Sequence, residues 1–554
     1  MSWRQYVYTL RYLRPVQIYG LVRKRLVHSL PAGSSVVQGA RLSAHIQPPR
    51  LPFLPTPKSL QGTSLTFLNH TVDYPLGVHW DDPALPKLWR YNLHYMPFLH
   101  QPGITATERR DWMRSWVRGN PDPRGEGWEP FPTSVRLVNW CKVWWMDGLP
   151  ERDDLLLASA YAQARHLRRC VEYHLQGNHL FENLKTLLWA GCTFQGVEAE
   201  TWQKWAVPRL MQQLQEQILP DGGHYERSPM YHAHILEGCL DLLNMQYAWE
   251  ELYPALAALL ISKTTKMLAW LETMTHPDGE IALFNDAAFG MAPAPHLLLD
   301  YGRKLGLTWP SPGCLTHLAV SGYVVIRDHD HYLVIDTGPL GPDYQPGHGH
   351  CDLFSFEWSV GPWRIVCDSG VYAYQDRIMR PYVRSTMAHN TVQIDNEDQS
   401  EVWKEFRVAR RAQPETICVE TAADGTVRVE GKHNGYRHLT GRPIHQRQFI
   451  FRGGKLAVLD KVTGGGTHEV EAFVHFHPTI TVKLVDDQML ELYLATRKIG
   501  HICCKSWQET SLLDGWYCPE FGKREPNTVL RLWSRVRLPF QGRVDIALDE
   551  EPLP

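Results

Sequence analysis

Several signatures of common protein classes are missing from this sequence of 554 residues. Its 11 cysteines are irregularly spaced and include no Cys-x-x-Cys pair, so they indicate neither a cysteine zinc module nor a disulfide framework. Free thiols of this kind suit a reducing compartment. No stretch of the sequence approaches the roughly 18 consecutive apolar residues of a membrane span.

The sequence also lacks an excess of charge of either sign. The net charge is −2, so no overall field attracts a polyanion, and no long basic run or nucleic-acid-binding motif is present. The opening, MSWRQYVYTLRYLRPVQIYGLVRKRL, has neither an uninterrupted apolar segment nor a small-residue cleavage site. We therefore expect a cytoplasmic protein. A periplasmic or membrane-associated location stays open, because this opening could also form an amphipathic surface helix.

The spacing of apolar residues divides the chain into three parts, and its length predicts two large domains. Residues 1–84 combine a helical segment with a Pro-rich connector. Residues 85–310 have apolar residues three and four apart and predict helices over 154–173, 179–190, 202–218, 232–251 and 254–274. Residues 311–554 contain short β-branched and aromatic runs punctuated by Gly, Asp and Asn, which predict an all-β domain, a sandwich in form.

The densest cluster of polar residues lies near the start of the all-β part. It comprises PGHGHCD at 346–352, CDSGVYAY at 367–374 and RSTMAHNTV at 384–392. His348 and His350 are two residues apart, so on a strand they would point to the same side. Imidazoles with one carboxylate suit a cation such as zinc, and three protein ligands leave one position open. Histidines that merely cap strand ends are the alternative, but their clustering with Asp368 and His389 favours a site.

Two further clusters lie in the helical part. In GNHLFENLKTLLWAG at 177–191, Asn178 is a good N-cap, and His179 and Glu182 share one helical face. A capped helix with an exposed polar turn explains this motif equally well. PDGGHYERSPMYH at 220–232 is a Gly-rich turn that enters a helix. Turn chemistry explains its glycines but not its concentration of Tyr, His, Glu and Arg, which is typical of sites on helical scaffolds.

With WRYNLHY at 89–95 and WEPFPTSVRLVNW at 128–140, these motifs resemble, in order, those of the heparinase II/III family of polysaccharide lyases. The resemblance extends over roughly residues 85–480. It implies an α+β multidomain fold in which an N-terminal (α/α) toroid precedes a C-terminal antiparallel β-sandwich, with the active cleft between them. The implied reaction is β-elimination on an acidic polysaccharide that contains uronic acid.

The resemblance also implies roles for individual residues. Those matching catalytic positions are Asn178, His179, Tyr231 and His348. Those expected to contact substrate are Glu182, Glu226, Arg227, Tyr374 and Arg384, with Tyr372 and Tyr382 as alternatives to Tyr374. Those matching the ligands of a structural or site-supporting Zn²⁺ are His350, Asp368 and His389, with His475 or His477 as competitors of His389.

These residue types suit an elimination. Hydrogen bonds from Asn178 and His179 would neutralise the uronate carboxylate, and each well-placed donor is worth roughly 3–4 kcal/mol in the transition state. His348 or Tyr231 would remove the C5 proton, and Tyr231 would protonate the leaving oxygen. A tyrosine with a pKa of about 10 is a poor base at neutral pH. It would need a cation beside it, and Arg227 or a protonated His348 is expected to provide one.

Two other functions compete with this interpretation. A glycoside hydrolase needs two carboxylates, for which Asp221, Glu182 and Glu226 are candidates, but it would leave the His and Tyr residues unused. A non-catalytic glycan-binding or exopolysaccharide-assembly protein would keep the lyase scaffold, yet every transferred position still has a suitable side chain. For a lyase, the near-zero net charge argues against a heavily sulfated polymer. It favours a bacterial exopolysaccharide, capsule or glycosaminoglycan-like polymer.

Overall fold

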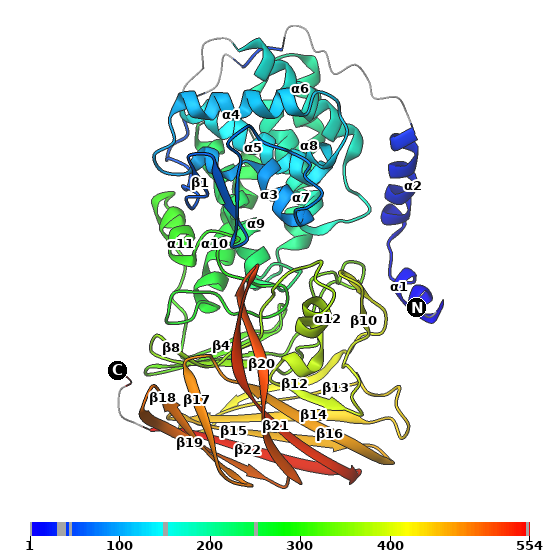
Figure 1. Ribbon diagram of the computed structural model, residues 1–554, viewed down its shortest axis with the longest axis vertical. Helices are drawn as coiled ribbons and strands as arrows, with labels where there is room; N and C mark the ends of the chain where they lie inside the picture. The colour runs from blue at the N-terminus through cyan, green and yellow to red at the C-terminus, as the bar shows by residue number, and fades with distance from the viewer. Residues whose placement is uncertain are drawn as a thin grey trace.

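A computed structural model describes residues 3–29, 40–43, 47–147, 153–248, 253–549 and 553. In these residues a helical domain is followed by a β domain, and the two are stacked along the long axis of the molecule (Figure 1). Helix α11 (Pro295–Lys304) and strand β4 (Leu315–Leu318) flank the position near residue 310 where the spacing of apolar residues changes. None of the described helices has the length and apolar composition needed to cross a bilayer.

The helical domain is built around one nearly fully buried helix. Around it, the described helices are α3 (Lys87–Tyr95), α4 (Ala106–Gly119), α5 (Pro130–Met146), α6 (Asp154–Cys170), α8 (Val197–Gln217), α9 (Pro229–Ala248) and α10 (Pro254–Thr273). The central helix, α7 (Gly177–Thr193), buries every side chain except that of His179. A helix that is buried on all sides belongs to the core of its domain, and here its polar side chains are paired, as Glu182 is with Lys185. The first turn of α7 therefore brings Asn178 and His179 to the inner end of the domain.

The segment before the helical domain contains two helices and a small sheet. Helices α1 (Trp3–Leu10) and α2 (Pro15–Ser29) agree with the predicted helical opening. Strands β1 (Leu60–Gln61), β2 (Ser64–Phe67) and β3 (His70–Asp73) form an antiparallel sheet where the sequence predicted only extended chain. Gly62 (φ 61°) and Asn69 (φ 58°) supply the left-handed turn positions between them. Strands of two to four residues are too short to show a clear alternation of polar and apolar residues.

The β domain contains three larger antiparallel sheets among the described residues. The first has the order β4-β5-β6-β7-β8, with β5 (Tyr323–Asp328), β6 (His331–Asp336), β7 (Phe356–Val360) and β8 (Trp363–Val366). The second has the order β12-β13-β14-β15-β22-β19-β18-β17, with β12 (Pro414–Thr421), β13 (Val427–His433), β14 (Ile444–Arg452), β15 (Lys455–Thr463), β17 (Ile480–Asp486), β18 (Met489–Leu494), β19 (Arg497–Lys505) and β22 (Phe540–Leu548). The third has the order β20-β21-β16-β9, with β9 (Val392–Ile394), β16 (Thr467–His475), β20 (Glu509–Glu520) and β21 (Lys523–Arg537).

The five-stranded sheet joins the two domains. On strand β5, Tyr323 and Val325 pack with Trp270 of α10, whereas Val324 and Ile326 pack into the core of the sandwich. Because successive side chains of a strand point to opposite faces, the same short strand contributes to both cores. Helix α12 (Met379–Arg384) and the pair β10 (Val402–Trp403) and β11 (Arg407–Val408) lie beside this junction (Figure 1). The junction is also where the predicted site residues meet.

Candidate active site

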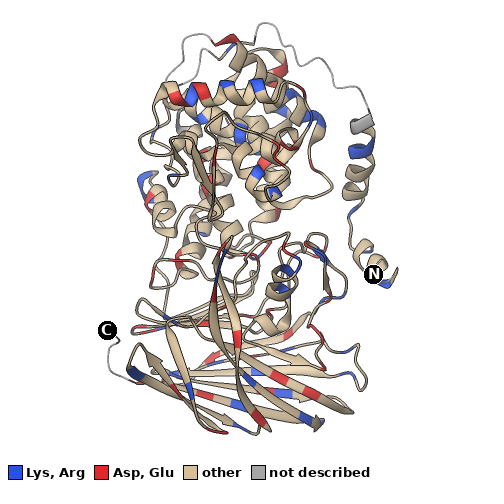
Figure 2. Ribbon diagram, in the orientation of Figure 1, with Lys and Arg blue, Asp and Glu red and all other residues tan. Residues whose placement is uncertain are grey.

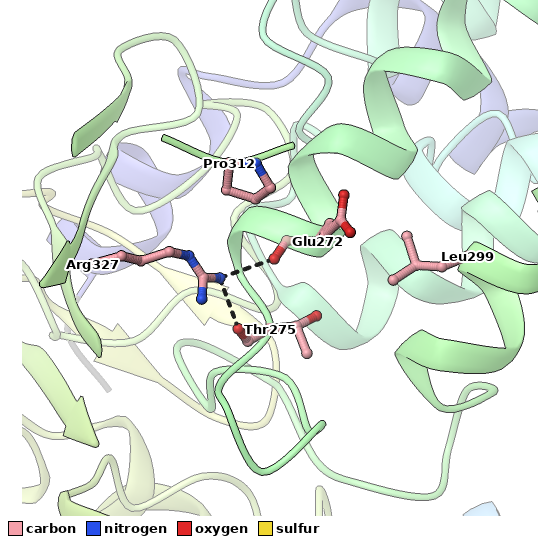
Figure 3. A pocket seen from close by; sticks show the side chains of 5 residues that line it. All are labelled: Glu272, Thr275, Leu299, Pro312 and Arg327. Atoms are coloured by element: carbon pink, nitrogen blue, oxygen red, sulfur yellow. Dashed lines mark hydrogen bonds between the residues drawn. The ribbon is translucent and has the colours of Figure 1, made fainter. Parts of the chain in front are cut away.

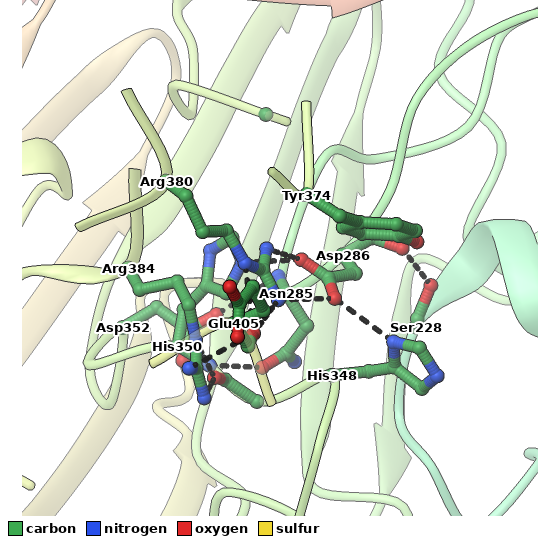
Figure 4. A network of polar contacts seen from close by, with 12 residues as sticks. Ser228, Asn285, Asp286, His348, His350, Asp352, Tyr374, Arg380, Arg384 and Glu405 are labelled. Carbon is green, nitrogen blue, oxygen red and sulfur yellow. Dashed lines mark hydrogen bonds and ion pairs between the residues drawn. The ribbon is translucent and has the colours of Figure 1, made fainter. Parts of the chain in front are cut away.

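A buried carboxylate organises the histidines of the β domain. The two oxygens of Asp286, in the segment between α10 and α11, lie 2.8 Å from His348 Nδ1 and 2.9 Å from His350 Nε2 (Figure 4). Arg380 of α12 pairs with both oxygens. Burial raises the pKa of the Asp286 carboxyl, but Arg380 and the two imidazoles outweigh it and hold that pKa well below its usual range. Asp286 is therefore ionised and accepts a hydrogen bond from His348 Nδ1, so the other ring nitrogen, Nε2, faces away from Asp286.

Two tyrosines meet this histidine at the junction of the domains. The hydroxyl oxygens of Tyr231 in α9 and Tyr374 in the β domain are 2.8 Å apart, and the rings of Tyr231 and His348 lie 3.9 Å apart between centroids. Burial, reinforced by the neighbouring tyrosine and by Asp286, raises the pKa of Tyr231 well above its ordinary value. The phenol is thus held protonated, which suits a general acid and disfavours a general base.

The first turn of α7 connects to this group through Glu226. The backbone N–H and the side-chain amide of Asn178 both donate to Glu226, at 2.8 to 3.2 Å. The same carboxylate also faces His348, whose Nε2 lies 3.4 Å from Glu226 Oε2. Gly177 makes this approach possible, because its φ is 57° and a Cβ there would meet Glu226 Oε1 at 2.3 Å. The glycine before Asn178 is therefore required by geometry.

His179 lies beside this group and remains open to solvent. Its side chain is 28% exposed, its ring contacts Phe131, and its Nδ1 lies 3.1 Å from Glu172 Oε2. Burial lowers the pKa of His179, but the Glu172 carboxylate outweighs it and the pKa is raised overall. An imidazole favoured in its cationic form is a suitable donor to a substrate carboxylate.

Three residues expected to contact substrate are held by the protein itself. Arg227 donates to the backbone carbonyls of Ser321 (2.9 Å) and Val320 (3.1 Å), and so ties the two domains together instead of lying beside Tyr231. Arg384 is 1% exposed and donates to the carbonyls of Gly349, Lys404 and Glu405. Glu182 is equally buried, 2.7 Å from Lys185 Nζ and 3.3 Å from His234. These contacts hold Arg227, Arg384 and Glu182 in the scaffold, and their binding to substrate stays a prediction.

Two of the three carboxylates proposed for a hydrolase, Asp221 and Glu182, are also engaged in the scaffold, whereas Glu226 lies beside His348. Asp221 accepts the backbone N–H groups of Val320 and Ser321, and Glu182 is paired as described above. The pocket drawn in Figure 3 has a volume of about 260 Å³, and none of its lining residues belongs to the catalytic cluster. Its Arg327 donates to the carbonyls of Glu272 and Thr275 (Figure 3). The chemistry-bearing residues are therefore those around His348.

Sequence reasoning missed Asp286, Arg380 and Glu172. Asp286 lies in the run LFND, where the only local signal is an Asn-Asp turn pair, and Asn285 indeed has a φ of 59°. Arg380 and Glu172 lie outside the motifs that carry the histidines. Asp286 contacts His348 and His350, more than 60 residues away, Glu172 contacts His179 seven residues later, and Arg380 pairs with Asp286, which no local pattern reveals.

The three predicted zinc ligands lie near one another. Asp368 Oδ2 is 2.8 Å from His389 Nδ1, and the rings of His350 and His389 are 5.3 Å apart between centroids. Among the described residues, no group of three His, Cys, Asp or Glu is arranged to hold a metal ion. His350 Nδ1 and His389 Nε2 are nevertheless buried without a hydrogen-bond partner, and such nitrogens fit the donors that zinc prefers. Of the competitors, His475 bonds to the Met387 carbonyl and His477 to Thr479.

Comparisons with known proteins agree with this geometry. The chain is 25% identical over 346 residues to a heparin-sulfate lyase of Bacteroides stercoris, covering 55% of this chain and 50% of that protein. It is 23% identical over 384 residues to the heparin-sulfate lyase of Pedobacter heparinus, covering 59% and 55%. The alignments thus span about half the length of these curated relatives.

The fold has solved counterparts. The crystal structure of heparinase III aligns with a TM-score of 0.69 at 16% identity, covering 86% of this chain and 80% of that one. This likeness shows that the domains are an (α/α) toroid and an antiparallel β-sandwich, as expected. Residues 69–294 match the family described as heparinase II/III N-terminus, and residues 310–546 match heparinase II/III-like, C-terminal. The chain belongs to the heparinase II/III family.

Proposed function

We propose that this protein is a polysaccharide lyase that cleaves a uronic-acid-containing polymer by β-elimination. The observation that carries the proposal is the contact between Tyr231 and His348, from two different domains, with Tyr374 and Glu226 completing the group. A protonated phenol stacked on an imidazole whose orientation is fixed is an acid–base pair. An elimination needs exactly one of each.

The structure favours one of the two assignments left open by the sequence. His348 Nε2 takes the C5 proton, because Asp286 holds Nδ1 and orients the ring. The C4–O bond breaks as the C4=C5 double bond forms, and the leaving oxygen receives the proton of the Tyr231 hydroxyl. His179 donates to the uronate carboxylate and so stabilises the negative charge that develops when C5 loses its proton. Positioned proton transfer contributes about 10²–10⁴-fold to the rate.

Asn178 serves this group through Glu226. Its amide donates to both Glu226 oxygens, so it fixes the carboxylate that faces His348. A substrate carboxylate can take over this amide only if Glu226 moves aside or is protonated. The role of Asn178 as a direct substrate ligand thus stays a proposal, whereas its role in positioning Glu226 rests on the contacts.

Zinc is proposed as a support of the β-domain wall of the site. It would be held by the orphaned nitrogens of His350 and His389, with Asp368 beside them. Bound there it would supply a fixed positive charge. The acid and base of the elimination are side chains of the protein, so His348 and Tyr231 do the chemistry.

The proposed substrate is a uronate polymer with little sulfation, of glycosaminoglycan or bacterial exopolysaccharide type. The curated relatives are named heparin-sulfate lyases, which supports a glycosaminoglycan-like backbone. The three arginines nearest the site, Arg227, Arg380 and Arg384, are engaged by carbonyls or by Asp286. Guanidinium groups already bound in this way are poorly placed to recognise sulfate.

The test is absorbance near 232 nm, the band of the unsaturated uronate product, on heparan sulfate, desulfated heparosan-type polymer, hyaluronan and uronate-containing exopolysaccharides. Tyr231→Phe and His348→Ala should each abolish the signal on the substrate that gives one, and Tyr374→Phe should reduce it less. Retained activity in either of the first two variants would refute the assignment. Binding of glycan with no absorbance on any polymer would favour the non-catalytic alternative.

A further inference from the structure

The first two helices expose an unusual share of apolar side chains. Among the described residues, 24 large hydrophobic side chains are exposed, and 11 of these lie between Trp3 and Leu26. In α1 they occur at Trp3 (71% exposed), Val7 (52%) and Leu10 (56%), and in α2 at Ile18 (52%) and Val22 (54%). Both helices lie along the flank of the molecule (Figure 1).

The side of these helices that faces the protein combines polar contacts with aromatic ones, such as those of Tyr6 with Trp403 and of Tyr19 with Tyr173. Thr9 donates to the Val408 carbonyl of the β domain, and Gln17 donates to the carbonyl of Tyr344 (3.0 Å). Gly20 packs so closely on the 173–174 backbone that a Cβ would lie 2.6 Å from the His174 nitrogen. A helix on a soluble protein normally turns its apolar stripe inward and its polar face outward. Here the outward side has the exposed apolar side chains named above, which fits an apolar medium on the outside.

The charge of the same segment is of one sign. Between Trp3 and Leu26 the basic residues are Arg4, Arg11, Arg14, Arg23, Lys24 and Arg25, and no Asp or Glu occurs there. The whole chain has a net charge of −2, so these six cations stand out against a near-neutral protein. Figure 2 shows Lys and Arg along both helices with no acidic residue among them.

We infer that α1 and α2 form a docking surface for an anionic lipid membrane, on which they lie in the plane of the interface. Exposed leucine, isoleucine and valine side chains enter the acyl boundary, tryptophan and tyrosine suit the headgroup level, and lysine and arginine attract anionic lipid. The inward contacts of Thr9 and Gln17 hold the helices to the body, so docking brings the whole enzyme to the surface. The inference does not depend on the proposed lyase activity.

A lipid surface fits better than a protein partner. Protein interfaces gather apolar side chains in a central patch that a polar rim surrounds. This surface mixes basic and apolar residues along two helices and offers no acid to a basic partner. A second copy of the chain would bring two basic segments together, and like charges at an interface cost affinity. The charge pattern therefore selects an anionic partner with an apolar interior.

The test is co-sedimentation of the full-length protein with vesicles of pure phosphatidylcholine and with vesicles containing 30% phosphatidylglycerol. We expect binding to the anionic vesicles only, weakened by added salt. Arg23→Glu/Lys24→Glu should weaken it at least roughly 30-fold, since each cation near the surface contributes about fivefold. Val7→Ser/Ile18→Ser/Val22→Ser should abolish it. Equal sedimentation of the wild type with both vesicle types, or with neither, would overturn the inference.

A matched control is available on the β domain. Leu484, Val485 and Met489 are exposed at the β17–β18 turn, next to Asp486 and Asp487. The Leu484→Ser/Val485→Ser/Met489→Ser variant should bind anionic vesicles like the wild type. Unchanged melting temperatures would show that the helix variants are folded. A concentration-dependent dimer that is lost in the Val7/Ile18/Val22 variant, measured by light scattering, would instead assign the surface to self-association and overturn the proposal.

Discussion

Replacing Asp286 tests whether this carboxylate orients the proposed base, His348, or only stabilises the fold. In the Asp286→Asn variant, the carboxylate that accepts from His348 Nδ1 becomes an amide that can donate to it. The imidazole would then carry its proton on Nε2, where it cannot accept the C5 proton. We expect kcat to fall by about 10²–10⁴-fold, the range over which a positioned base contributes.

The same change also removes the counter-charge of a buried cation. Arg380 is 2% exposed and pairs with both Asp286 oxygens, so the variant leaves a guanidinium without a carboxylate partner. Breaking one side of a buried pair costs about 3–5 kcal/mol. For a domain of this size that corresponds to a melting temperature lower by roughly 6–20 °C. Activity must therefore be measured at a temperature where the variant is shown to be folded.

The double variant Asp286→Asn/Arg380→Met separates the two effects. Methionine keeps the length of the arginine stem and removes the unpaired charge, so much of the lost stability should return. The activity should not return, because His348 still lacks an acceptor at Nδ1. The assay is the initial rate at 232 nm across pH, beside thermal unfolding. Near-wild-type kcat in folded Asp286→Asn would refute the idea that this carboxylate sets the tautomer of His348.

Three further predictions address the acid response, the interdomain arginine and the metal. Burial raises the pKa of Glu182, but Lys185 outweighs it and lowers that pKa from 4.5 to about 2. Ionised Glu182 therefore contributes about 3 kcal/mol to the free energy of unfolding above pH 4.5, and this contribution is lost as the pH falls towards 2. In Glu182→Gln, the free energy of unfolding measured with urea should depend less on pH in this window, and an unchanged pH dependence would contradict the prediction. Arg227→Gln should lower the melting temperature while leaving KM within twofold. A tenfold rise in KM at an unchanged melting temperature would instead indicate that Arg227 binds substrate. Elemental analysis should find zinc in the wild type but not in His350→Ala/His389→Ala, and chelation should lower the melting temperature of the wild type. Equal zinc content in the two proteins would refute these ligands.

The helices and the order of the domains followed from residue spacing because their signals are local. α6 (Asp154–Cys170) and α10 (Pro254–Thr273) lie almost where apolar periodicity placed them, since one face of each must be buried. The three-stranded sheet β1–β3 was missed because its strands are too short to display alternation. Motif resemblance predicted residues that the fold brings together, such as Tyr231 and His348, but it did not predict the contacts that their neighbours make.

The directions of Arg227 and Arg384 show why. Arg227 has a φ of 58°, a backbone conformation that is uncommon for a side-chain-bearing residue and that the sequence does not announce. Its guanidinium lies with Ser321, 94 residues along the chain. Arg384 likewise bonds to carbonyls contributed by two distant loops. Whether an arginine faces substrate or scaffold is decided by such long-range partners, so a single sequence cannot settle it.

Contacts at the interdomain junction fix the relative positions of Tyr231 and His348. Ser228 Oγ, at the start of α9, donates to the Asp286 carbonyl at 2.6 Å, and Trp270 Nε1 of α10 donates to Ser321 Oγ at 2.9 Å. The first bond joins the turn that carries Tyr231 to the segment that orients His348. The second fixes α10 on the five-stranded sheet. In the proposed mechanism the acid belongs to the helical domain and the base to the β domain, so a shift of the junction by 1 Å would separate them without altering either residue. The contacts between the domains should thus affect the proposed activity as well as stability.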